Sequence, residues 1–399
     1  MTTTTIQKII GINEIIKNIY DFVQKDKLIK EDFKEYVTTM GASNATPAQL
    51  EKIFIPYVFE RRIGEPAKAI IEHYCERGSK KKNEIAKSLL TAQYSIFEIK
   101  RILKNGFKLY NLTNEKEYEV LSLTKMTSFR GLGIGEFIVA RIFKLQNEYY
   151  LIGIDNTLSS SQEDDATRYA VVRIVQAPWL VYEDNEEKEN LIKATVSENY
   201  DKFIQMYGTD EIITTNKYAD TIIGNINEED KEENFDLKEA TKPLNEYKFF
   251  DIKELNNNYD NFIENSLGGF SSHKEIYDVG VIVNKEYGIY TIPFYKTFCN
   301  IMEGIETKNS KKCIEYFLNN DSISDIILKK LADKYPNFME TINKTLDSKY
   351  TLDSLIEKYK WDFTRRKIYS STSVLFHSNV FATSLGLLDG VNEFVETNG

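Results

Sequence analysis

The stretch YSIFEIKRILKNGFKLYNL, residues 94–112, decides much of the fold, because apolar and polar residues alternate along it on both sides of Asn105-Gly106. Alternation with a period of two is typical of a β-strand that buries one face, and Asn-Gly is a frequent hairpin turn. The segments YEVLSL (118–123), FIVARIF (137–143) and YYLIGI (149–154) add three further strands. Five short strands within about 60 residues predict a small barrel or rolled sheet, since closure removes exposed sheet edges.

The glycine-rich segment RGLGIG, residues 130–135, lies between the third and fourth predicted strands. Alternate glycines allow a phosphate to approach the backbone. A nucleotide-binding loop of this kind, however, follows a strand and opens a helix. Here a strand follows the glycines, so we interpret the segment as a flexible β connection.

The segments YSIFEI (94–99), GFKLYNLTNEKEYEV (106–120) and GEFIVARI (135–142) resemble a module in a family of bacterial proteins to which no activity is assigned. The resemblance extends back through FIPYVFE (54–60). It implies a helical N-terminal region followed by a small β-rich module. Some members of the family carry a cysteine-rich SEC-C zinc motif at the C-terminus. This chain has no cysteine cluster, so the zinc motif is not implied here.

Composition bounds the class of protein. The chain has 399 residues, of which 42% are hydrophobic and 28% charged, as in ordinary globular proteins. Its net charge of −10 disfavours non-specific nucleic-acid binding, which uses a basic face, but is compatible with a local basic patch. The three widely spaced cysteines and the absence of a signal-peptide pattern or a long apolar run lead us to expect a cytoplasmic protein without a membrane segment.

Patterning along the chain predicts an α+β fold that is mostly helical, with a small five-stranded β-barrel-like module and one C-terminal β-hairpin. Thr46-Pro47 is a typical helix start, and Glu186–Tyr207 reads as a helix that ends at Gly208. The predicted regions are a helical region (1–93), the β module (94–155), a second helical region (156–224), an acidic linker (225–241) and an α-rich C-terminal domain with a hairpin over 277–292 (242–399).

A search for catalytic chemistry identifies no catalytic residue, metal site or cofactor. The three histidines, His73, His273 and His377, lack zinc-ligand spacing, and no motif surrounds Cys299 or Cys313. The cluster Glu163-Asp164-Asp165 could bind Mg²⁺, but acids at this position more often begin a helix. An enzyme of unrecognised type therefore remains only an alternative.

Basic and aromatic residues provide the candidate binding residues. Four of them could share one face of the β module: Lys108, Tyr110, Arg130 and Arg141. The other two, Arg365 and Arg366, follow the aromatic residues Trp361 and Phe363. We expect a non-enzymatic protein that binds a protein or peptide partner through helical grooves and the β module. The alternative is a nucleic-acid-associated protein, since small barrels bind single strands and aromatic residues interleaved with arginine can hold them.

Overall fold

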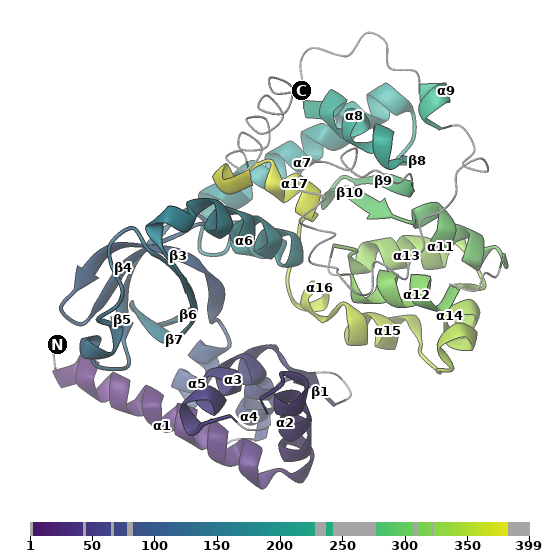
Figure 1. Ribbon diagram of the computed structural model, residues 1–399. Coiled ribbons are helices and arrows are strands. Elements are labelled where there is room, and N and C mark those ends of the chain that lie inside the picture. The colour runs from purple at the N-terminus through teal and green to yellow at the C-terminus, as the bar shows by residue number, and fades with distance from the viewer. Residues whose placement is uncertain are drawn as a thin grey trace, which may run out of the picture. The chain divides into compact units, whose positions relative to one another are not determined.

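A computed structural model describes residues 3–42, 45–64, 68–77, 83–227, 237–241, 277–305, 310–320 and 322–381. The chain forms two compact units, Met1–Ala166 and Thr167–Gly399 (Figure 1). Helices, a closed barrel and a second sheet confirm the predicted α+β fold. None of the helices in the described ranges is both long enough and apolar enough to cross a membrane.

Five helices open the first unit. They are α1 (Thr3–Lys25), α2 (Lys27–Thr39), α3 (Pro47–Glu60), α4 (Ile70–Arg77) and α5 (Asn83–Leu89), with a short ribbon of β1 (Arg62–Ile63) and β2 (Lys68–Ala69) after α3. The predicted start of α3 is confirmed, because Thr46 and Gln49 form a capping box that satisfies backbone N–H groups of the first turn. Asp26 caps α2 by its side chain alone, which accepts hydrogen bonds from the backbone N–H groups of Leu28 and Ile29.

The five predicted strands close into a barrel. They are β3 (Gln93–Leu103), β4 (Gly106–Asn111), β5 (Glu117–Ser122), β6 (Phe137–Leu145) and β7 (Glu148–Leu158), in the order β3-β4-β5-β7-β6. Only β5 and β7 run parallel; the other neighbours are antiparallel. Gly106 is required where β4 approaches β5, because a Cβ atom there would lie 1.9 Å from the carbonyl oxygen of Val120.

The barrel is covered on one side by the helices (Figure 1). Its interior holds an apolar cluster that includes Phe97, Phe107 and Ile138. On the outer surface, Phe143 and Tyr150 pack into a second cluster with α1–α5. Strand β6 is therefore buried on both faces, which explains why its sequence is a nearly continuous apolar run, interrupted only by Arg141 and Lys144.

The second unit is built around a three-stranded antiparallel sheet in the order β10-β9-β8. The predicted hairpin is confirmed as β9 (Asp278–Asn284) and β10 (Gly288–Pro293). Strand β8 (Glu211–Thr215) lies in a region that we expected to be helical, so that expectation is wrong there. Gly208 ends the preceding helix in a left-handed conformation, and the β-branched residues that follow favour a strand over a helix.

Helices complete this unit. Before β9 these are α6 (Glu163–Gln176), α7 (Glu186–Tyr207), α8 (Asn216–Asn227) and α9 (Leu237–Ala240); after β10 they are α11 (Tyr295–Met302), α12 (Ser310–Asn319), α13 (Asp325–Lys334), α14 (Phe338–Leu346), α15 (Leu352–Tyr359), α16 (Trp361–Arg365) and α17 (Ser371–Leu375). Most of the helices after β10 share one apolar core with the sheet. Of the predicted acidic linker, residues 228–236 lie outside the described residues.

Candidate functional site

One end of the barrel brings together two segments that are separate in sequence. The first is the tip of the β3–β4 hairpin, and the second is the loop over residues 123–136. The backbone N–H of Ser122 donates to the carbonyl of Asn105 at 2.9 Å, and that of Gly135 donates to the carbonyl of Ile99 at 2.9 Å. The Phe129 ring contacts Phe107 edge-on, with centroids 5.4 Å apart, so the loop covers the end of the apolar interior.

Basic side chains gather on these two segments. Residues 99–108 and 123–136 contain six lysines and arginines but one acid, Glu136, although the whole chain carries a net charge of −10. Two of the lysines have carboxylate partners: Lys100 pairs with Glu98 and Lys108 with Glu117, each at 2.6 Å. The other four are exposed and form no ion pair with any described residue; they are Arg101, Lys104, Lys125 and Arg130.

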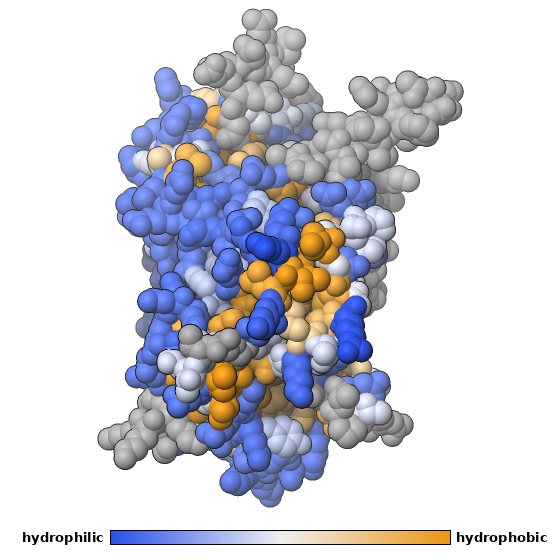
Figure 2. All heavy atoms as spheres, turned by 90° about the vertical axis from the view of Figure 1, so that its left-hand side faces the viewer, coloured by the Kyte–Doolittle hydropathy of each residue, from blue (hydrophilic) through white to orange (hydrophobic). Residues whose placement is uncertain are grey.

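Two isoleucines lie among these cations. In the barrel, all of whose residues are described, the large apolar side chains that remain exposed are Ile102, at 44%, and Ile134, at 67%. Figure 2 faces the side on which β4, β5 and α1 lie in Figure 1, and it shows apolar side chains gathered among strongly hydrophilic ones. We call the set of Arg101, Ile102, Lys104, Lys125, Arg130 and Ile134 the barrel-end surface.

Of the six predicted site residues, only Arg130 belongs to the barrel-end surface. Lys108 and Tyr110 lie nearby on the outer face of β4, as their alternation predicts. Lys108 is held by Glu117, and the Lys100 ammonium lies 5.4 Å from the centre of the Tyr110 ring. Burial raises the pKa of Tyr110. Both residues therefore have protein partners already.

Arg141 lies elsewhere, under the helices. Its side chain is 3% exposed and pairs with Glu60 of α3 at 2.5 Å. Its guanidinium lies over the rings of Phe59, at 4.8 Å, and Tyr94, at 4.5 Å. These contacts join β6 to α3, and they leave no surface of Arg141 for a ligand.

Arg365 and Arg366 belong to the second unit and face two different tryptophans. The Arg365 guanidinium lies 3.4 Å from the ring centre of Trp361, which is 8% exposed. The Arg366 guanidinium lies 4.8 Å from the Trp179 ring and 4.0 Å from the Glu183 carboxylate. Each arginine thus packs on its own tryptophan, and the two do not form one basic platform.

The described cysteines and histidines, which were considered for catalysis, are buried or half-buried. Burial raises the pKa of both Cys299 and Cys313, which disfavours the reactive thiolate. The His73 Nε2 lies 3.0 Å from the carbonyl oxygen of Ile63, and burial lowers the pKa of His377. Predicted candidate His273 lies outside the described residues.

The acidic cluster at residues 163–165 forms the first turn of α6, as the helix-start interpretation expects. In the ranges that the structure describes, no group of three histidine, cysteine or acidic side chains is placed to hold a metal ion. The Mg²⁺ alternative therefore has no geometric support in those ranges.

Three cations of the barrel-end surface, Arg101, Lys104 and Lys125, were not among the predicted site residues, and the sequence indicates the position of only one of them. Lys104 directly precedes the Asn105-Gly106 turn, so its place at a hairpin tip is readable from sequence. Arg101 follows a register shift after Ile99, which breaks the alternation that would assign its face. Lys125 lies in a loop whose path the sequence does not define.

Comparison with known proteins adds no identity: no family model, no curated protein and no solved structure matches the chain. The resemblance to the bacterial family therefore stays a prediction. Topology gives a coarser likeness. A closed barrel of five strands in which the third and fifth run parallel has the Greek-key order of OB-folds, which bind oligonucleotides and oligosaccharides. A fold of this kind does not by itself determine a function.

Proposed function

We propose that this chain is a non-enzymatic interaction protein whose barrel-end surface binds a protein or peptide segment that carries both acidic and apolar side chains. The observation that carries the proposal is the placement of four cations without acidic partners beside two exposed isoleucines. An acidic segment would supply the missing counter-charges, and apolar side chains of the partner would remove Ile102 and Ile134 from water. Charge complementarity of this kind raises the association rate and selects the partner.

Nucleic acid is the competing ligand for the same cations, and the OB-like strand order favours it. Single strands are held by bases that stack on exposed aromatic rings, whereas the exposed apolar groups here are aliphatic. The loops that grip ligands in OB-folds join strands one and two and strands four and five. In this barrel those connections are tight turns at residues 104–105 and 146–147. A peptide fits these features better.

The cytoplasm is the location that we propose for this interaction. All three cysteines are described, and all three are free thiols. Free thiols persist in the reducing cytoplasm, while secreted proteins of this size more often pair them.

Affinity purification from the host tests the proposal, with lysate halves that are treated or not treated with nuclease. The test variant is Arg101→Glu combined with Arg130→Glu. The matched control is Lys17→Glu combined with Lys25→Glu, because these exposed lysines of α1 also form no ion pair with a described residue. We expect a set of partner proteins that survives nuclease, is lost in the test variant and is retained in the control.

Two results would contradict the proposal. Retention of the same partners by the test variant would show that the barrel-end surface is not the binding site. Loss of all partners after nuclease treatment would show that nucleic acid is the ligand. Circular dichroism of both double variants confirms that each is folded before its partners are compared.

A further inference from the structure

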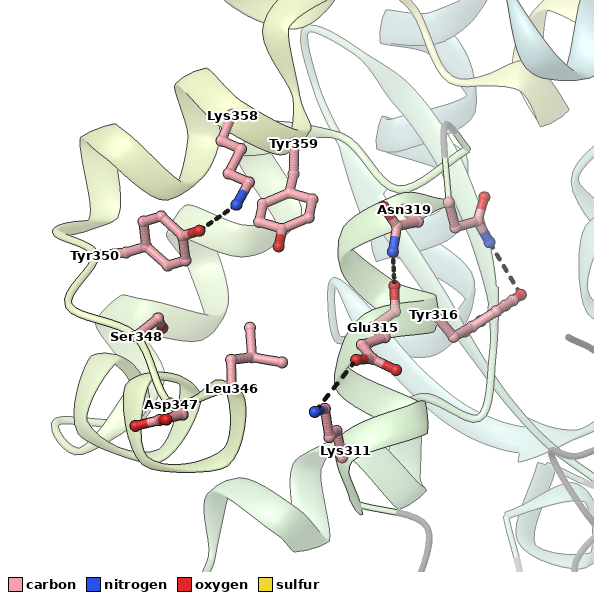
Figure 3. Close-up of a pocket in the computed structure, with 11 residues that line it drawn as sticks. Lys311, Glu315, Tyr316, Asn319, Leu346, Asp347, Ser348, Tyr350, Lys358 and Tyr359 are labelled. Atoms are coloured by element: carbon pink, nitrogen blue, oxygen red, sulfur yellow. Dashed lines mark hydrogen bonds and ion pairs between the residues drawn. The ribbon is translucent and has the colours of Figure 1, made fainter. Parts of the chain in front are cut away.

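The second unit contains a groove that the proposed function does not use. It lies between α12 on one wall and the α14–α15 connection with the end of α15 on the other (Figure 3). Its volume is about 730 Å³, which is enough for a ligand of one or two rings. Eleven residues line it, of which four belong to α12: Lys311, Glu315, Tyr316 and Asn319.

Ten of the eleven lining side chains carry a polar atom, while the tyrosine rings and Leu346 supply apolar surface. Leu346 is the one lining residue without a polar atom in its side chain. Sites for apolar ligands are lined mainly by hydrophobic side chains, so this groove suits a ligand with many hydrogen-bonding groups. Its lining includes hydroxyl, amide, ammonium and carboxylate groups, which provide both hydrogen-bond donors and acceptors.

A lysine ammonium is held in place on the α15 wall. The Lys358 Nζ donates a hydrogen bond to the Tyr350 hydroxyl. It also lies over two aromatic rings, 4.8 Å from the centre of the Tyr350 ring and 5.1 Å from that of Tyr359. These contacts fix the position of the charge without neutralising it, since neither ring carries an opposite charge. The hydrogen bond to Tyr350 also raises the pKa of Lys358, which keeps it protonated.

The α12 wall carries a second ammonium group, that of Lys311, and one carboxylate, that of Glu315. Lys311 Nζ lies 4.0 Å from the Glu315 carboxylate, at the limit of an ion pair. Asn319, one turn further along, donates from its amide nitrogen to the backbone carbonyl of Glu315, so its amide oxygen is left to accept. Figure 3 shows Lys311 and Glu315 directed into the groove, while the carboxylate of Asp347 is turned away from α12. Positive charge therefore exceeds negative charge inside the groove.

We propose that this groove binds a small anionic sugar, that is, a sugar that carries a phosphate or a carboxylate group. Lys358 contacts the anionic group from the α15 wall, and the Lys311 ammonium, the Tyr359 hydroxyl, the Glu315 carboxylate and the Asn319 amide contact sugar hydroxyls. A simple anion would use only an ammonium group, and the carboxylate of Glu315 would oppose it. A neutral sugar would leave the held ammonium of Lys358 without an acceptor from the ligand.

Isothermal titration calorimetry of the full chain tests this assignment. The probes are glucose 6-phosphate and glucuronate, which distinguish a phosphate from a carboxylate, with glucose and inorganic phosphate as the comparison ligands. We expect one of the two anionic sugars to bind at least tenfold more tightly than both comparison ligands. The variants Lys358→Gln and Lys311→Gln should each weaken that binding at least tenfold, since each removes one charge-assisted hydrogen bond.

Lys349→Gln is the matched control, because Lys349 is an exposed lysine in the same connection and does not line the groove. It should leave the affinity unchanged within twofold. Lys358→Arg keeps the charge and should retain more affinity than Lys358→Gln if the latter loses only binding and not its fold.

Three outcomes would overturn the proposal. The first is that neither anionic sugar binds to the folded wild-type chain. The second is that inorganic phosphate binds as tightly as the anionic sugar that binds best, because the sugar hydroxyls would then contribute nothing. The third is that the Lys349 variant weakens binding as much as the Lys358 and Lys311 variants do.

Discussion

Arg141→Met tests the conclusion that Arg141 holds the first unit together and does not bind a ligand. Removal of one partner from a buried ion pair costs about 3–5 kcal/mol. The lower end applies here, because the remaining partner, Glu60, is 49% exposed and regains contact with water. Loss of the contacts with the two aromatic rings adds about 1 kcal/mol, while the methionine side chain recovers part of the packing. We expect the free energy of unfolding of the first unit to fall by about 3 kcal/mol.

The two tryptophans of the chain make this measurement specific. Trp179 and Trp361 both lie in the second unit, so tryptophan fluorescence follows that unit alone, whereas far-ultraviolet circular dichroism follows both units. For a urea dependence of about 2 kcal/mol per molar, a loss of 3 kcal/mol lowers the unfolding midpoint by about 1.5 M. The shift should appear in circular dichroism and not in fluorescence.

Lys108→Met is the control for Arg141→Met. Lys108 also forms an ion pair with a glutamate, but its side chain is 35% exposed and its partner is 49% exposed. Exposed pairs contribute about 0–1 kcal/mol, so the control should shift the midpoint by less than about 0.5 M. Equal shifts for the two variants, or a shift of Arg141→Met that is seen in fluorescence, would refute the reasoning.

Three further predictions concern other buried positions. Burial raises the pKa of Asp278 to about 6, above its value in the unfolded chain. Ionisation of Asp278 therefore destabilises the fold as the pH rises. Between pH 5 and pH 7.5 the free energy of unfolding of the wild type should fall by about 1.5 kcal/mol, and that of Asp278→Asn should not. Parallel pH profiles would contradict this. Gly106→Ala should destabilise the barrel by more than about 3 kcal/mol in urea unfolding, because the new Cβ atom meets a backbone oxygen. Gly131→Ala is the control: nothing lies within 4 Å of its new Cβ atom, so the free energy of unfolding should change by less than about 0.5 kcal/mol. A thiol reagent should modify Cys75 in the native protein and the two buried cysteines only after unfolding; fast reaction of all three would show that the core opens readily.

The strands of the barrel could be predicted because their information is local. The alternation of Phe107, Lys108, Leu109 and Tyr110 assigns each side chain to the interior or the exterior without knowledge of any other segment. Strand β8 was missed because five residues between two helices carry too little periodicity to compete with the helical pattern on either side.

The environment of Arg141 could not be predicted, because it depends on contacts between distant segments. The face predicted for Arg141 is the outside of the barrel, since Ala140 and Ile142 on either side of it point inward, but the sequence cannot show that α3 covers that part of the outside. The partner, Glu60, is 81 residues away in sequence. The groove of the second unit could not be predicted for the same reason: its walls come from α12 and α15, and no sequence pattern indicates that these two helices lie close together.

The closing strands of the barrel also determine when the first unit can fold during synthesis. β3 must pair with β6, where Gln93 meets Ile142, and β5 must pair with β7, where Val120 meets Tyr149. A nascent chain that ends before residue 137 therefore has three strands with two open edges. Its N-terminal helices also lack the apolar surface of Phe143 and Tyr150 on which they pack. Until β6 and β7 leave the ribosome, this incomplete unit exposes two features that favour aggregation, open strand edges and uncovered apolar surface.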